Sequence, residues 1–403
     1  MTGKGLICNQ KGIYMKLLMY GAGSIGRGFI GPLFAQAGYE VVFADVNRVV
    51  IDALNTRRGY SCTIAGRSFN VGVTGVRCVD ANDRQAVISE IASCDLMATA
   101  LGAAVLQAVA PVISEGFAAR IKASGEPLNI LICENLKDAG ALLRTWMENA
   151  LPEEDRSCLT DKCGFVETAI GRMVPVAVNN PSDPLHITVE EYAFLPVDKD
   201  AFIGAPPVVE GLIPYSPFVF YEERKLYLHN MGHAVCAYLG MQYGHSTICG
   251  AIGDPCIRYL LQSAMVESAS MLSEKHKVPF REVFDHAEDL ILRFSNAALG
   301  DTCERVGRDP LRKLAAGDRL AGALQECRKY GVYPVYIALG YAAALKYVTT
   351  DPDEARKIAL DTGCLSPDQA EIIIRLFRET GKPLAALMQT AEMVKKELRG
   401  NVV

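Results

Sequence analysis

One stretch in the second half of the sequence brings together three side chains that could move a proton and stabilise charge on an oxygen. Lys225, Asn230 and His233 lie within nine residues. At about 100° per residue, Asn230 falls about 140° and His233 about 80° from Lys225, so the three share one broad side of a helix. Apolar neighbours would disfavour the charged amine of Lys225 and make it a usable base for an alcohol proton. A solvated helix face is the alternative that the spacing leaves open.

A glycine-rich turn near the start of the sequence has the pattern of a dinucleotide site. An expected buried strand at 16–20 runs directly into GAGSIG, which matches GxGxxG. The first glycine would allow a tight turn, the second a close approach to a pyrophosphate, and the third close packing of helix on strand. Backbone N–H groups at the helix start would face the anion. The predicted cofactor-binding residues of this turn are Gly21, Gly23, Ser24, Ile25 and Gly26.

Two later strand ends fit the same cofactor. Asp45 closes the next expected strand, 24 residues after Gly21. A carboxylate there would accept a hydrogen bond from the ribose 2′-OH and repel a 2′-phosphate, so NAD is favoured over NADP, although Arg48 lies close by. Asn135 follows a later strand and could hold the nicotinamide ribose, or it could cap the next helix. A glycine turn that holds no cofactor is the alternative.

Hydrophobic patterning places these motifs in two different domains. Short buried strands alternate with helices up to about residue 150, which predicts an α/β domain with a parallel sheet, and β-rich segments lie at 60–76 and 165–197. Beyond residue 216, long amphipathic stretches predict a mainly α-helical C-terminal domain. A ligand site is expected in a cleft between the domains. The predicted divisions are an extension at 1–14, a Rossmann-type NAD-binding domain at 15–205 and a substrate and catalytic domain at 206–403.

The overall composition argues against several classes of partner. Half of the residues are hydrophobic and the formal charge is −5, so the sequence lacks the basic excess that nucleic acid or an anionic membrane would need. The apolar window at 96–113 contains Gly102 and Pro111, which favours strand, turn and helix over a membrane span. The thirteen cysteines include no CxxC pair, which predicts reduced thiols, a cytoplasmic protein and no clustered metal ligands.

The pattern Lys225-x4-Asn230-x2-His233 resembles the signature of the mannitol dehydrogenase family of polyol-specific long-chain dehydrogenases. The same resemblance extends over YGAGSIGRGFIGPLFAQAGYEVVFADVN, ICEN at 132–135, ERKLYLHNMGHAVCAYLG at 223–240 and ERVGRDPLRKLAAGDRL at 304–320. It implies an NAD-dependent and metal-independent oxidoreductase. In such an enzyme Lys225 would be the general base, and Asn230 and His233 would polarise the reacting oxygen.

Four cations lie within nine residues of this acidic sequence, from Arg305 to Lys313. Such a cluster suits a phosphate, which arginine can bind through two hydrogen bonds. Relatives that act on unphosphorylated polyols or hexonates differ here, so the resemblance implies a small sugar or polyol phosphate as the partner. The predicted phosphate ligands are Arg305, Arg308 and Arg312, and the alternative is a solvated loop paired with Glu304 and Asp309. We expect a monomer or a homodimer.

Three positions depart from the family pattern near the expected substrate. Glu167 stands where phosphate-type relatives carry an aspartate, Gly171 precedes Arg172, and Leu195 replaces a common tryptophan. These departures leave the substrate open. A sister polyol or hexonate dehydrogenase, a non-catalytic NAD-binding sensor and a metal-dependent alcohol dehydrogenase are the alternatives to be separated.

Overall fold

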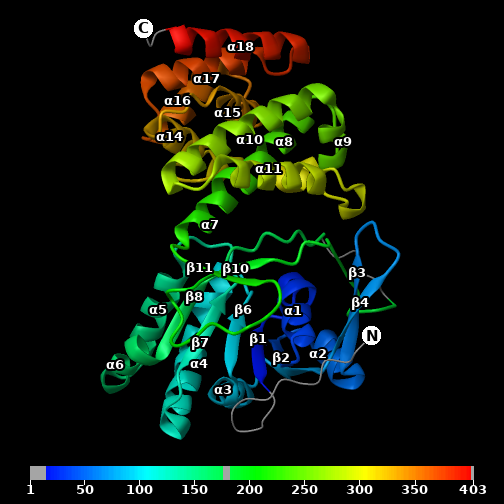
Figure 1. The fold of residues 1–403 in the computed structure, drawn as a ribbon, viewed down its shortest axis with the longest axis vertical. Helices are drawn as coiled ribbons and strands as arrows, with labels where there is room; N and C mark the ends of the chain where they lie inside the picture. The colour runs from blue at the N-terminus through cyan, green and yellow to red at the C-terminus, as the bar shows by residue number, and fades with distance from the viewer. Residues whose placement is uncertain (1–14, 176–181, 401–403) are drawn as a thin grey trace. The chain divides into compact units, whose positions relative to one another are not determined.

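The computed structural model describes residues 15–175 and 182–400, so the predicted extension at 1–14 lies outside the described residues. The chain divides into two compact units, Met1–Val219 and Phe220–Val403 (Figure 1). This division falls later than the predicted boundary at 205/206. The reason is that β11 (Leu212–Tyr215) pairs in parallel with β10 (Leu195–Asp198), which ties the proline-rich residues 205–217 to the first unit.

The first unit is built on a six-stranded sheet in the order β5-β2-β1-β6-β7-β8, in which every neighbouring pair is parallel. When these six strands alone are numbered by their order in the sequence, the sheet has the order 3-2-1-4-5-6, which is that of dinucleotide-binding sheets. The predicted α/β architecture is therefore confirmed. The strands are β1 (Lys16–Tyr20), β2 (Glu40–Asp45), β5 (Val76–Asp80), β6 (Leu96–Thr99), β7 (Leu128–Ile132) and β8 (Cys163–Glu167).

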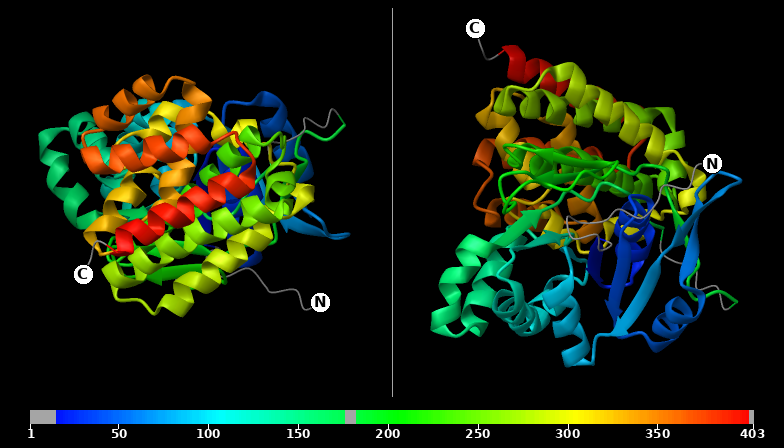
Figure 2. Two further views of the ribbon diagram at one scale, coloured as in Figure 1. Left: turned by 90° about the horizontal axis from the view of Figure 1, so that it is seen from above. Right: turned by 60° about the horizontal axis from the view of Figure 1, so that its bottom comes forward.

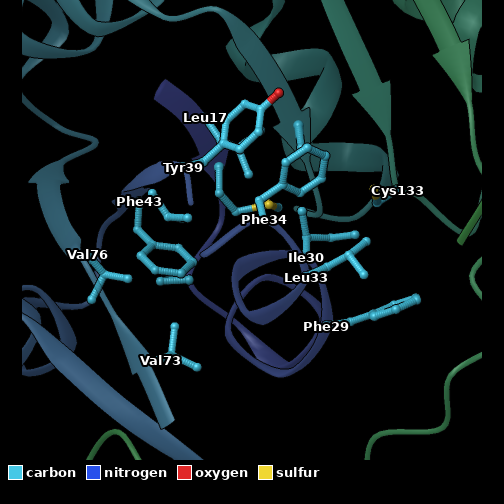
Figure 3. Packing of buried hydrophobic residues seen from close by; sticks show 14 of the residues in the cluster. Leu17, Phe29, Ile30, Leu33, Phe34, Tyr39, Phe43, Val73, Val76 and Cys133 are labelled. Carbon is cyan, nitrogen blue, oxygen red and sulfur yellow. The ribbon is translucent and has the colours of Figure 1, made fainter. Parts of the chain in front are cut away.

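Alternate residues of β1 enter two separate hydrophobic clusters because successive side chains of a strand point to opposite faces. Leu17 and Met19 pack with the helical segment that follows the glycine turn, and Figure 3 shows the rings of Phe34 and Phe43 in this cluster. Leu18 belongs to the other cluster. The segments that supply the first cluster include η1 (Gly26–Ile30), α1 (Gly31–Gln36) and α2 (Arg48–Arg57), and the second includes α3 (Arg84–Ser93), α4 (Ala103–Ser124) and α5 (Ala139–Ala150).

Helix α4 begins where predicted and runs to Ser124, beyond the predicted end at 115, and it ends at Gly125, which has a left-handed φ of +69°. By length and composition alone, α4 is apolar enough to cross a membrane. Its side chains Leu106, Ala110, Ile113 and Phe117 are instead fully buried in the second cluster of the sheet. The strand, turn and helix predicted for this window are thus present as β6, Gly102 and α4.

A smaller sheet completes the first unit and contains the β-rich segment predicted at 60–76. The hairpin of β3 (Gly59–Ile64) and β4 (Asn70–Thr74) is antiparallel, and β9 (Ile187–Val189) adds in parallel to β3. The right-hand view of Figure 2 shows the hairpin beside the larger sheet. Helix α6 (Glu153–Lys162) joins α5 to β8.

The second unit is mainly helical, as predicted (Figure 1). Four of its helices, α9, α12, α13 and the C-terminal α18, had not been predicted. Its helices are α7 (Val219–Glu223, beginning at the boundary), the π-helix η2 (Arg224–Asn230), α8 (Met231–Gln242), α9 (Ile248–Gly253), α10 (Pro255–His276), α11 (Phe280–Phe294), the 3-10 helix η3 (Ala297–Leu299), α12 (Cys303–Gly307), α13 (Pro310–Leu314), α14 (Ala321–Lys329), α15 (Val335–Val348), α16 (Pro352–Asp361), α17 (Pro367–Glu379) and α18 (Leu384–Gly400).

Candidate active site

The three glycines of the turn after β1 each show a geometry that suits the predicted role. Gly21 has a φ of +108°, which favours glycine, and its N–H donates to the carbonyl of Ala44 at 2.8 Å. A Cβ on Gly26 would lie 2.0 Å from the Gly21 carbonyl oxygen, so helix and strand could not pack as they do. A Cβ on Gly23 would meet nothing within 4 Å. Gly23 therefore borders open space, as a close approach to a pyrophosphate requires.

The helix start presents backbone donors at the same place. The first intrahelical bond runs from the N–H of Arg27 to the carbonyl of Gly23 at 3.0 Å, so the N–H groups of Ser24, Ile25 and Gly26 precede it. Gly23 and Ser24 are exposed, and Ile25 is half-buried. The N–H groups at the start of a helix are suited to bind an anion.

Two charged side chains form hydrogen bonds with the backbone of Ala22. Its N–H donates to Asp45 Oδ2 at 2.7 Å, and its carbonyl accepts from Arg27 Nε at 2.6 Å. Burial lowers the pKa of Arg27, although the nearby Tyr60 and Asp45 act against this shift. Asp45 thus sits at the glycine turn, where the sequence predicts the ribose ligand. Arg48, whose side chain is exposed, pairs with Asp52 and Asp80, each at 3.3 Å.

The carboxyl ends of β6 and β7 are joined by Glu134, which sequence reasoning did not assign to the site. Its two carboxylate oxygens accept the N–H groups of Leu101 and Gly102 at 2.8 and 2.7 Å. In the sequence, only its position just after a buried strand could have indicated that Glu134 belongs to the site. Asn135 is exposed beside it, and α5 is preceded by Asp138, so Asn135 does not cap that helix. The position of Asn135 remains consistent with a cofactor contact.

Lys225, Asn230 and His233 lie on one continuous helical segment, but its first part is π-helical. The π-helix η2 carries Lys225 and Asn230, and α8 begins immediately after it with His233 in its first turn. The predicted spacing of about 100° per residue therefore does not hold between Lys225 and Asn230, because a π-helix bonds i to i+5. All three side chains are half-buried rather than solvated. This disfavours the alternative of a solvated face.

His229 is a further member of this segment that the sequence analysis missed. It lies four residues from both Lys225 and His233, a helical spacing that could have found it. Its ring is buried and its centroid lies 6.2 Å from that of His233. Burial, followed by the charges of Arg293 and other neighbouring cations, holds its pKa well below the ordinary value. A neutral imidazole therefore lies next to the predicted catalytic side chains.

His233 is held by two residues far from it in the sequence. Its ring stacks on Phe294, with centroids 4.6 Å apart and planes inclined by 13°. Its Nε2 lies 3.0 Å from Asp301 Oδ2, at an ion-pair distance but without the direction of a well-formed hydrogen bond. Burial would raise the pKa of Asp301, but His233 and Arg305 together hold it below its ordinary value. Asp301 is therefore a carboxylate that lies beside two of the predicted site residues, His233 and Arg305. No local pattern in the sequence indicated it.

The predicted phosphate ligands have different surroundings. Arg305 donates through Nε to Asp301 at 2.7 Å, and Arg312 pairs with Asp318 at 3.3 Å, so the predicted alternative partners Glu304 and Asp309 are not the ones used. Arg308 is exposed, and no ion pair to it is present among the residues that the structure describes. Of the three arginines, Arg308 is thus the least committed to a carboxylate.

Lys313, at the end of the same cation cluster, is only 3% exposed. Burial, followed by the charges of Arg319 and Arg312, lowers its pKa to about 8. A bound anion would offset the repulsion between Lys313 and these two arginines.

The three departures from the family pattern also have defined places. Glu167 Oε1 accepts the N–H of Gly140 at 2.5 Å, in the first turn of α5. A Cβ on Gly171 would lie 3.3 Å from the ring of Tyr192. Leu195 is fully buried in the first hydrophobic cluster.

The described part of the chain contains no group of three or more His, Cys, Asp or Glu residues placed to hold a metal ion. The cysteines that the structure describes are free thiols, and most are buried. Burial raises the pKa of Cys62 to about 11, for example, which makes it a poor nucleophile at neutral pH.

A parallel sheet of order 3-2-1-4-5-6 with an intact glycine turn, followed by a helical unit with a lysine, asparagine and histidine segment, defines the class of nucleotide-dependent dehydrogenases. Comparison with known families specifies the class further. Residues 15–211 match the mannitol dehydrogenase Rossmann domain and residues 218–401 match the mannitol dehydrogenase C-terminal domain. The chain belongs to the mannitol dehydrogenase family. This membership confirms the predicted kind of enzyme, an NAD-dependent oxidoreductase that acts on a CH–OH group.

Two solved structures share the whole architecture. A substrate-free D-sorbitol dehydrogenase aligns with a TM-score of 0.76 at 14% identity, over 95% of this chain and 97% of that one. Mannitol 2-dehydrogenase of Pseudomonas fluorescens, solved with NAD and D-mannitol, aligns with a TM-score of 0.71 at 16% identity, over 95% of this chain and 94% of that one. At these identities the likeness establishes the fold.

Proposed function

We propose that this enzyme interconverts D-mannitol 1-phosphate and D-fructose 6-phosphate, the activity of a mannitol-1-phosphate 5-dehydrogenase. The observation that carries the proposal is the cation cluster at 305–313, in which Arg308 is exposed and has no ion pair within the described ranges. A guanidinium of this kind suits the bidentate binding of a phosphate. The resemblance of ERVGRDPLRKLAAGDRL at 304–320 to that enzyme supports the same substrate.

The proposed mechanism assigns one task to each group. The glycine turn, Asp45 and Asn135 would hold NAD, which would supply the hydride acceptor for the alcohol carbon and, as NADH, the hydride donor for the ketone. Lys225 takes the hydroxyl proton as the carbonyl forms, so the proton and the hydride leave separately and the charges balance. Asn230 and His233 donate to the reacting oxygen and stabilise its partial negative charge. The arginine cluster holds the phosphate and so fixes which carbon is presented.

A sister activity on an unphosphorylated polyol or a hexonate is the second candidate. The observation that favours it is the pairing of Arg305 with Asp301 and of Arg312 with Asp318, which satisfies part of the charge offered to a phosphate. The two structural relatives are also named for unphosphorylated polyols. The remaining proposals from the sequence, a cytoplasmic protein that is monomeric or dimeric, apply to both candidates.

Initial rates of NADH oxidation test the substrate. The proposal predicts a kcat/KM for fructose 6-phosphate at least about a hundredfold above the values for fructose and fructuronate, because charge-assisted hydrogen bonds to one phosphate supply a few kcal/mol. Arg308→Gln should reduce this preference and leave the rate with fructose unchanged. Equal kcat/KM values for the three sugars would contradict fructose 6-phosphate as the substrate. Binding of NADH without turnover of any sugar would favour the sensor, and loss of activity after exhaustive chelation would favour a metal-dependent enzyme.

A further inference from the structure

The backbone around Asp301 is fixed by a distant part of the chain. The carbonyl of Asp301 accepts the N–H of Ile248 at 2.9 Å, and the next residue, Thr302, forms an isolated antiparallel bridge with Thr247. The N–H of Cys303 donates to the carbonyl of Ser246 at 2.9 Å. Asp301 is therefore held in place independently of any contact that its side chain makes.

The two oxygens of this carboxylate face two different functional side chains. Oδ2 lies 3.0 Å from His233 Nε2, and Oδ1 accepts from Arg305 Nε at 2.7 Å and from Nη2 of the same guanidinium. The Asp301 side chain is only 11% exposed, so water competes weakly for either contact. One buried carboxylate thus joins a predicted catalytic imidazole to a predicted phosphate ligand.

The surroundings of His233 define which ring edge can reach a substrate. Stacking on Phe294 fixes the plane of the ring, and Nε2 is buried against Asp301. Asp301 lies at an ion-pair distance from Nε2 and so occupies that edge of the ring. Nδ1 is then the ring nitrogen that remains for the reacting oxygen. A flip of the ring about the Cβ–Cγ bond would put Cε1 in the place of Nε2, and the contact with Asp301 opposes that flip.

The surroundings of Arg305 divide its donors in the same way. Asp301 takes the edge formed by Nε and Nη2, and the described residues supply no acceptor to Nη1. A guanidinium has donors on two edges, so an anion can bind Nη1 while Asp301 holds the other edge. The carboxylate therefore orients the arginine without removing it from phosphate binding.

We propose that Asp301 is a positioning residue that sets the separation between His233, at the reacting C–OH group, and Arg305, at the anionic end of the substrate. The spacing of these two groups selects substrates in which the reacting carbon and the anion are the matching distance apart. The part that concerns Arg305 rests on the proposed function, whereas the link to His233 does not. Asp301 itself touches neither substrate nor cofactor.

Double-mutant cycles test this coupling. Asp301→Asn keeps the shape of the side chain and removes its charge. We expect it to lower kcat about tenfold to a hundredfold and to raise KM for the sugar phosphate about tenfold, with an unchanged Kd for NADH. The decrease in kcat should vanish in a His233→Ala background, and the increase in KM should vanish in an Arg305→Gln background. Residues that act through one another are non-additive, whereas a general loss of structure would add in both backgrounds. Additive effects would overturn the proposal.

Asp254→Asn provides the matched control. Asp254 caps α10 and lies 3.9 Å from His245, so it is a second aspartate beside a histidine in the same unit, and asparagine serves as well in a helix cap. It should leave kcat and KM unchanged. Far-UV circular dichroism checks that each variant is folded. If Asp301→Asn does not fold, Asp301→Glu takes its place in both cycles, since a displaced carboxylate should lower kcat in the wild-type background and not in His233→Ala.

The wild-type rates separate this proposal from the proposed function. If fructose 6-phosphate has no advantage over free sugars, the substrate proposal fails. In that case the double-mutant cycle of Asp301→Asn and His233→Ala is measured with the sugar that gives the highest rate. It still shows whether Asp301 acts through His233. If the phosphate advantage is present and both cycles are additive, only the role of Asp301 fails.

Discussion

The backbone N–H of Ala22 lies 2.7 Å from Asp45 Oδ2, which joins the glycine turn after β1 to the end of β2. The predicted ribose ligand is therefore also a support for the turn that would hold the pyrophosphate. Arg27 completes this support by donating from Nε to the carbonyl of Ala22 at 2.6 Å. The predicted binding of the ribose and the observed shape of the turn therefore involve the same carboxylate.

Asp45→Ala should weaken NADH binding through both functions of the carboxylate. Hydrogen bonds to a charged group contribute roughly 1.5–3 kcal/mol, so the Kd for NADH should rise about tenfold to a hundredfold. The preference for NADH over NADPH should narrow as well, because the charge that repels a 2′-phosphate is lost. Fluorescence titration with both nucleotides measures the two effects. Asp161→Ala, at an exposed position in α6, is the control, and a wild-type Kd for Asp45→Ala would remove Asp45 from the site.

Gly26→Ala should prevent the first unit from folding normally. The new Cβ would lie 2.0 Å from the Gly21 carbonyl oxygen and 3.4 Å from Met19 Cγ, and backbone cannot yield as a side-chain end can. Overpacking of this kind costs roughly 1–3 kcal/mol or more. Urea unfolding followed by the fluorescence of Trp146, which lies in α5 of this unit, measures the loss of stability.

Gly23→Ala is the matched variant in the same turn. Its Cβ would meet nothing within 4 Å, so the stability of the unit should change by less than about 0.5 kcal/mol. The methyl group would, however, occupy the space through which a pyrophosphate approaches the backbone, and the Kd for NADH should rise at least about tenfold. Unchanged affinity for NADH would show that Gly23 does not border the cofactor.

Lys225→Met should abolish turnover and preserve cofactor binding. Methionine has a similar length but no amine, and loss of a general base typically lowers kcat about 10²- to 10⁴-fold. Stopped-flow measurement of hydride transfer, together with NADH titration, separates chemistry from binding. Lys329→Met, at an exposed lysine 3.8 Å from Glu326, is the control with the same change of side chain. A wild-type kcat for Lys225→Met would exclude the amine as the base.

Glu267 predicts a pH dependence of stability in the helical unit. Burial raises its pKa to about 8, although the N–H groups of Tyr336 and Ile337 donate to its carboxylate and oppose the rise. The folded chain therefore keeps a proton that the unfolded chain releases above about pH 4.5. The free energy of unfolding should fall as the pH rises from 5 to 8, by up to roughly 4 kcal/mol relative to Glu267→Gln, which carries no such proton.

Urea unfolding at several pH values, followed by far-UV circular dichroism, measures this difference. The control is Glu288→Gln, since Glu288 is exposed and pairs only with Gln262 at 2.8 Å among the contacts described. Its stability profile should run parallel to that of the wild-type chain. A Glu267→Gln profile that is also parallel would show that Glu267 is ionised in the folded chain throughout this range.

Local patterns were sufficient for the elements that carry the chemistry. The run of buried residues at 16–20, the glycine turn and Asp45 follow one another within a single βαβ unit, so their spacing in the sequence is also their relation in space. The Lys225, Asn230 and His233 segment was recognisable because helical neighbours are three to five residues apart. Even there, the π-helix η2 altered the angles that an α-helix would give.

Contacts between distant segments were decided only by the tertiary structure. Asp301 lies 68 residues after His233, and no local pattern links an aspartate in a loop to a histidine in a distant helix. Glu134 reaches across from β7 to the turn after β6. The pairing of β11 with β10, two segments that are separate in the sequence, likewise extends the first unit beyond the predicted boundary at 205/206. The sequence alone therefore determined the type of each predicted site residue and its place along the chain. Which carboxylate orients which of these groups depends on packing between segments far apart in the chain, because a buried charge is stable only beside the partner that the fold supplies.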